Sequence, residues 1–62
     1  MKRVDLIRHL REHGCEFVRE GGSHSLFRNT KIGTKSTIPR HNEINEVLVA
    51  KICKDLEIPK PS

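Results

Sequence analysis

The segment Gly22-Ser23-His24 has the residue types best suited to chemistry in this 62-residue sequence. Histidine titrates near neutral pH, so its side chain can both accept and donate a proton. Glycine lets another backbone approach closely, and the N–H groups of such a turn can bind a phosphate oxygen. RNA carries its own nucleophile, the 2′-hydroxyl, so one histidine with nearby cations could cleave a strand. From spacing alone, however, an ordinary surface histidine after a turn is the commoner case.

The charge balance favours a polyanion as partner. The chain has 12 Lys and Arg against 8 Asp and Glu, a net charge of +4, and nucleic acid is the commonest partner of so basic a small protein. Arg28 follows His24 on the same strand face, and Lys35 is in the next strand. The sequence contains no Walker loop, dinucleotide fingerprint, paired-carboxylate site or Ser-His-Asp order.

Other reactive side chains have a commoner structural interpretation. His9 and His13 have i, i+4 spacing with Cys15 nearby, which suits zinc, but no second Cys/His pair follows, and solvated histidines are the commoner case. His41 is either a second proton-transfer or RNA-contacting group or a loop cap. We expect Cys15 beside the core and Cys53 within it. The arginines of the first helix form either a solvated face or an RNA-contact face; they are Arg3, Arg8 and Arg11.

Hydrophobic periodicity predicts five elements. A first helix over Arg3 to His13 would bury Val4, Ile7 and Leu10, with Leu6 widening the stripe, and Gly14 would end it. A last helix would run from a cap near Asn45 to about Leu56. Three strands are predicted between the helices: Cys15 to Arg19, Ser23 to Arg28, and Lys35 to Ile38, the first two joined by a turn at Glu20-Gly21-Gly22. We expect a frayed tail at Lys60-Pro61-Ser62.

These elements predict an α+β fold of order α-β-β-β-α, with both helices on one face of an antiparallel sheet and the other face open. Phe17 and Phe27 would lie on the covered face. Alternation would then direct His24 and Arg28 to the open face, with Leu26 partly exposed. With 34% hydrophobic residues the core is thin, so we expect one domain, 1–62, with an open surface site.

The start of the chain is unlike a signal peptide, because Met1-Lys2-Arg3 leads into a charged, periodic segment. No apolar run approaches the roughly 20 residues that a membrane span needs. We therefore expect a cytoplasmic protein with reduced thiols.

The whole chain resembles the HicA (YcfA-like) toxins of toxin–antitoxin pairs. The residues that carry the resemblance are Arg19–His24, Phe27, Ile38–His41 and the helical stretch Glu43–Leu48. The chain departs from many relatives at Val47, where they have glycine.

The resemblance implies a double-stranded-RNA-binding-domain-like fold and an mRNA interferase, which is an endoribonuclease that arrests growth. It implies that His24 is the active-site residue, that no metal or other cofactor is required, and that a HicB-like antitoxin covers the histidine. We expect Gly22, Ser23, Arg28 and Lys35 to bind the mRNA substrate. Two alternatives remain at this point: a non-catalytic RNA-binding module, and a protein whose only role is to bind its partner.

Overall fold

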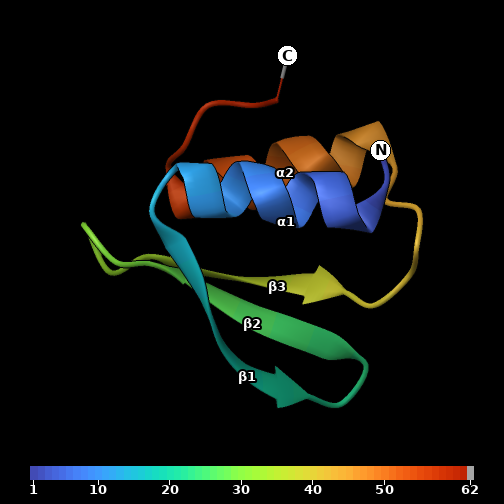
Figure 1. Cartoon of the computed structure of the whole chain (residues 1–62), viewed down its shortest axis with the longest axis horizontal. Coiled ribbons are helices and arrows are strands. Elements are labelled where there is room, and N and C mark those ends of the chain that lie inside the picture. The colour runs from blue at the N-terminus through green and yellow to red at the C-terminus, as the bar shows by residue number, and fades with distance from the viewer. Residues whose placement is uncertain (62) are drawn as a thin grey trace.

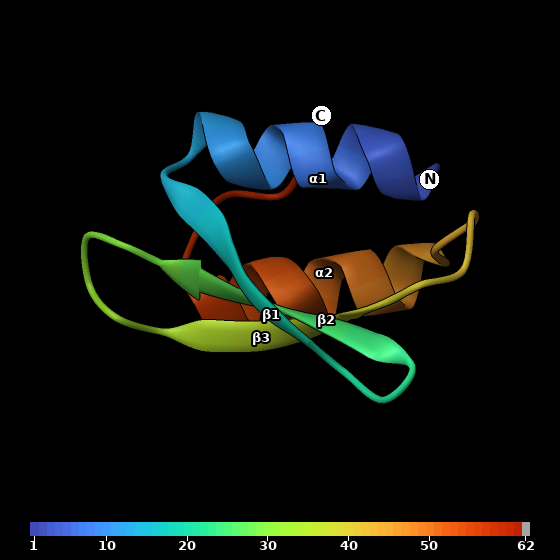
Figure 2. The same ribbon diagram turned by 60° about the horizontal axis from the view of Figure 1, so that its bottom comes forward.

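A computed structural model describes residues 1–61 of the chain and confirms the predicted order of elements. The two helices run in the same direction on one side of a three-stranded antiparallel sheet (Figures 1 and 2). The elements are α1 (Arg3–Glu12), β1 (Cys15–Gly21), β2 (His24–Asn29), β3 (Lys35–Pro39) and α2 (Glu46–Leu56).

Helix α1 buries a narrower stripe than the sequence predicted. Leu6 and Leu10, one turn apart, are fully buried, and Ile7 is half-buried. The prediction for Val4 was wrong, because this side chain is 61% exposed. The reason lies at the neighbouring Arg3, whose side chain bonds to the sheet and so turns the next position outward.

Helix α2 begins and ends close to where the sequence predicted. The Asn45 side chain accepts a hydrogen bond from the Leu48 N–H (2.9 Å) and so caps the first turn. At the other end Glu57 adopts the left-handed conformation that closes many helices, with φ of 58°. Between them a buried face meets the sheet; its residues are Val49, Ile52, Cys53 and Leu56.

The sheet has the order β1-β2-β3, and β2 is its central strand. Strand β3 packs against α2 and the start of β1 against α1, whereas the β1–β2 turn reaches farthest from the helices (Figure 1). This arrangement corrects the expectation for Phe17. Its pairing with Phe27 places it on the helix side, and the two rings meet edge to face at 5.9 Å, yet Phe17 is 47% exposed. Only Cys15 at the start of β1 is buried, and the later residues of this edge strand receive little cover.

The β1–β2 turn is shorter than the predicted Glu20-Gly21-Gly22, because the strands extend to Gly21 and from His24. Only Gly22 and Ser23 remain in the loop. Gly22 has φ of 59°, which matches the type II′ hairpin turn, where glycine occupies the first central position. This turn therefore fixes the point at which His24 enters the strand.

The C-terminal segment contacts α1 just before Lys60, the first residue of the tail that the sequence predicts to be frayed. The Pro59 carbonyl oxygen lies 2.6 Å from Nε2 of His9 on α1, and Pro61 is half-buried; Ser62, the last residue of the predicted tail, lies outside the described residues. In the part of the chain that the structure covers, both helices are too short and too polar to cross a membrane.

Replacing Leu10 by alanine should lower the free energy of unfolding by about 2–5 kcal/mol, because it opens a cavity in the core. Val4→Ala should cost no more than about 0.5 kcal/mol, as expected of an exposed position. Thermal unfolding followed by circular dichroism compares the two. A large loss of stability for Val4→Ala would indicate that Val4 is buried, as the sequence predicted.

Gly22→Ala should lower the free energy of unfolding by about 1 kcal/mol, because an L-residue is strained at this positive φ. Gly21→Ala is the matched control, since an added Cβ meets no atom within 4 Å at either glycine and Gly21 has no positive φ. Gly21→Ala should leave stability unchanged or slightly raised. Equal urea midpoints for the two variants would contradict this.

Candidate functional site

The side of the sheet that faces away from the helices carries the candidate site. Along β2, Ser25, Phe27 and Asn29 are buried against the helices. The intervening residues therefore point to the other side: His24 and Arg28 are exposed there, and Leu26 is half-buried. This confirms the faces that alternation predicted for β2.

A β-bulge at Val18 brings a further cation to the same side. Phe17 pairs with Phe27, but the next pair is Arg19 with Leu26, so one extra residue is inserted in β1. Without it, Arg19 would lie on the same face as Phe17, two residues away. With it, Arg19 joins the open face. Arg19 has no role at the site predicted from the sequence, because no residue type marks a bulge at this point.

A shallow depression of about 160 Å³ lies on this face. Its walls come from all three strands, since Leu26 pairs with Arg19 on one side and with Thr37 on the other. The lining residues are Arg19, Gly21, His24, Leu26 and Thr37. The depression thus combines a titratable imidazole, a guanidinium, a hydroxyl and a small apolar floor. Its volume is below the range of pockets that enclose small molecules, as expected for so short a chain.

His24 is the first residue of β2, and it pairs with Gly21 of β1 and Pro39 of β3. Its Nδ1 lies 3.4 Å from the Ser23 hydroxyl oxygen. Within residues 1–61, Nε2 has no hydrogen-bond partner. An exposed imidazole with one free nitrogen can exchange a proton with a bound substrate.

The other predicted RNA-binding residues divide into two groups. Gly22 and Ser23 form the turn directly before His24. Arg28 and Lys35 pair with each other across β2 and β3, and Arg28 is four strand residues from His24, about 13 Å at the usual rise per residue. Arg28 and Lys35 can therefore contact a strand that runs past the depression, but they do not line the depression.

The remaining histidines lie outside the depression. His41 is exposed in the loop after β3. The rings of His9 and His13 are in contact at a tilt of 49°, with 4.3 Å between centroids, and Nδ1 of His13 lies 2.9 Å from the His9 carbonyl oxygen. Within the described chain no three His, Cys, Asp or Glu side chains are placed to hold a metal ion.

Cys15 and Cys53 are both fully buried and unbonded, as expected for core residues. Burial raises the pKa of both thiols, which disfavours the reactive thiolate. Neither cysteine therefore suits a nucleophilic role.

Comparison with known proteins identifies the family. The family described as HicA toxin of bacterial toxin-antitoxin matches residues 4–58 of the 62-residue chain. No curated protein and no solved structure gives a match. The family match spans the whole sheet, α2 and all of α1 except Arg3, and it includes the depression around His24. The chain therefore belongs to the HicA toxin family and is the toxin of a toxin–antitoxin pair.

Proposed function

We propose that this toxin is an endoribonuclease that cleaves mRNA, with His24 as its proton-transfer residue. The observation that carries the proposal is the depression in which His24 and Arg19 lie on one open face. Family membership supports it, since a toxin needs a target whose loss arrests growth. The shape also supports it, because a shallow site admits a polymer strand more readily than it encloses a small substrate.

The proposed reaction uses the nucleophile that RNA supplies. His24 accepts the proton of a 2′-hydroxyl, and the 2′-oxygen forms a bond to the adjacent phosphorus. The bond from phosphorus to the 5′-oxygen breaks, and this oxygen takes up a proton from solvent. The products are a 2′,3′-cyclic phosphate and a 5′-hydroxyl. Negative charge develops on the non-bridging oxygens, and a guanidinium beside His24 stabilises it.

The position of each cation on the open face determines which phosphate we expect it to bind. Arg19 lines the depression with His24, so we assign it to the phosphate that reacts. Arg28 and Lys35 lie farther along the same face and bind flanking phosphates. Within residues 1–61 none of these three cations forms an ion pair with a carboxylate, so their charge is available to a polyanion.

The antitoxin implied by the family is proposed to be HicB-like and to cover His24. Leu26 supports this placement, because it is a half-buried apolar side chain on the floor of the depression. A protein that covered the depression would bury Leu26 and exclude RNA at the same time.

Expression of the wild-type chain should arrest bacterial growth, and His24→Ala should abolish the arrest, because the proposed base is lost. His13→Ala, which changes a histidine outside the depression, should still arrest growth. Purified protein should cleave labelled RNA in the presence of a chelator. It should leave intact a strand with a 2′-deoxy substitution at the cleaved position.

Each alternative has its own outcome in these assays. Binding of RNA without cleavage would identify a non-catalytic RNA-binding module. If the protein neither binds nor cleaves RNA, the remaining alternative is a protein whose only role is to bind its partner. Cleavage at the 2′-deoxy position would exclude the 2′-hydroxyl mechanism.

Arg19→Met should lower kcat by about 100-fold, as is typical when one stabilising donor is removed from a transition state. Arg28→Met is the matched control, because it removes the same charge from the same sheet face about 13 Å from His24. It should raise KM and leave kcat within a factor of two. Steady-state cleavage of a short RNA gives both constants. Equal effects on kcat would show that Arg19 acts only as one of several surface cations.

A further inference from the structure

A chain of polar contacts runs behind the depression, on the helix side of the sheet. Its centre is Ser25, the residue after His24, which is fully buried. The Ser25 hydroxyl accepts a hydrogen bond from Nη2 of Arg3 (2.8 Å) and donates to the Glu20 carboxylate, whose oxygens lie at 2.9 and 3.0 Å. A buried hydroxyl is costly without partners, and this one is bonded on both sides.

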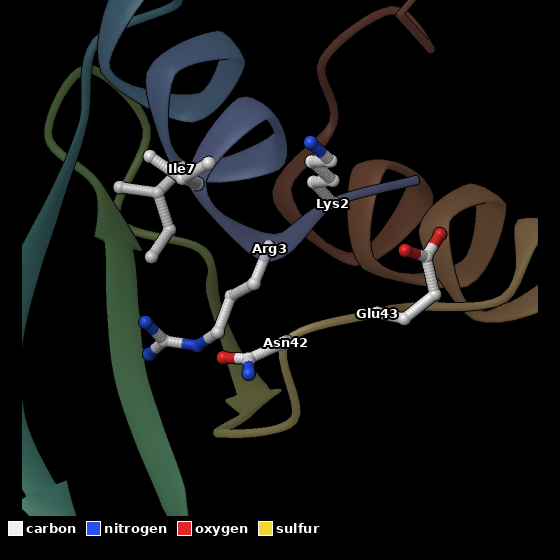
Figure 3. A pocket seen from close by; sticks show the side chains of 6 residues that line it. Lys2, Arg3, Ile7, Asn42 and Glu43 are labelled. Carbon is white, nitrogen blue, oxygen red and sulfur yellow. The ribbon is translucent and has the colours of Figure 1, made fainter.

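Arg3 holds this hydroxyl from a fixed position. Its Nε donates to the Pro39 carbonyl oxygen (2.9 Å), and its backbone N–H donates to the Asn42 carbonyl oxygen (2.8 Å). Figure 3 shows the Arg3 side chain extending from the first turn of α1 toward β2. The start of α1 is therefore tied both to the end of β3 and to the strand that carries His24.

Arg40 completes the chain at the turn. It forms an ion pair with Glu20 (3.5 Å), and its Nη2 donates to the Gly22 carbonyl oxygen. Its backbone N–H donates to the Ser23 carbonyl oxygen (3.3 Å). Both residues of the β1–β2 turn are thus held through their carbonyl groups by the residue that follows β3.

These contacts fix the residues on either side of His24. We infer that Arg3, Glu20, Ser25 and Arg40 form a positioning cluster that holds the His24 backbone in the geometry that RNA cleavage requires. The inference rests on the proposed function and extends it to residues behind the sheet. The cluster acts through the turn and the strand, since Ser25 is buried on the helix side, away from the depression.

The chain offers a matched control for this role. Ser36 is a second buried serine on the helix side of the sheet, in the neighbouring strand, and its hydroxyl donates to the Asp55 carboxylate at 3.3 Å. It pairs with Phe27, three residues beyond His24. Ser25→Ala and Ser36→Ala each remove a buried hydroxyl that donates to a carboxylate, but only Ser25 adjoins His24 and also accepts a hydrogen bond from Arg3.

Ser25→Ala should lower kcat for RNA cleavage at least tenfold and leave KM within twofold, because the cations of the open face stay in place. Small displacements of a catalytic group lower the rate by factors of about 10². Ser36→Ala should leave both constants within twofold. Rates are referred to folded protein, measured by circular dichroism. An unchanged kcat for Ser25→Ala, or an equal fall for Ser36→Ala, would overturn the inference.

Glu20→Gln distinguishes a positioning role of Glu20 from a purely electrostatic one by the direction in which KM and kcat change. Removing an acidic charge close to an RNA site should strengthen RNA binding and so lower KM. If Glu20 also positions the turn, kcat should fall at the same time, by about tenfold, because the ion pair with Arg40 is lost. A kcat that stays constant or rises would show that Glu20 does not belong to the positioning cluster.

Amide hydrogen exchange tests the cluster without any activity. The amides of Ser23 and His24 should exchange faster in Ser25→Ala than in Ser36→Ala. If the wild-type protein does not cleave RNA, the proposed function fails, and this comparison still decides whether the cluster holds the turn. If the wild type cleaves RNA and the two variants have equal exchange and cleavage rates, the positioning cluster is contradicted, whereas the proposed function is not.

Discussion

The burial of Phe27 determines how the central strand is oriented. Phe27 is the largest fully buried side chain, and it packs among the residues of both helices. Because successive side chains of a strand point to opposite faces, this one contact directs Ser25 and Asn29 inward and His24 and Leu26 outward. A shift of one residue would bury the imidazole. The exposure of the candidate catalytic group is therefore a consequence of core packing.

The orientation of β2 could be predicted from the sequence, because it depends on patterns along the chain. Helical spacing in α2, the cap at Asn45 and the alternation in β2 are each encoded within a few consecutive residues. The whole-chain resemblance added the family, which the residues alone did not give. The exposed His24 followed from these local rules, and its role in cleavage remains a prediction.

Other features of the fold and of the candidate site could not be predicted, because they depend on contacts between residues distant in the sequence. The exposure of Phe17 follows from the course of β1, an edge strand whose only buried residue is its first, Cys15. Arg3 was assigned to the surface arginines of the first helix, but its partner Ser25 is 22 positions away in the sequence. Arg19 reaches the depression through a bulge, which alternation cannot reveal. Each of these features needs the tertiary structure.

The bulge at Val18 has a second consequence, for association between copies of the chain. Strand β1 is an edge of the sheet within the described residues, and a regular edge strand is a template on which the strand of another molecule can form. The extra residue interrupts the row of backbone donors and acceptors, and the charged side chains of Glu16, Arg19 and Glu20 flank it. The irregularity that brings Arg19 to the open face of the sheet thus also discourages sheet extension between molecules.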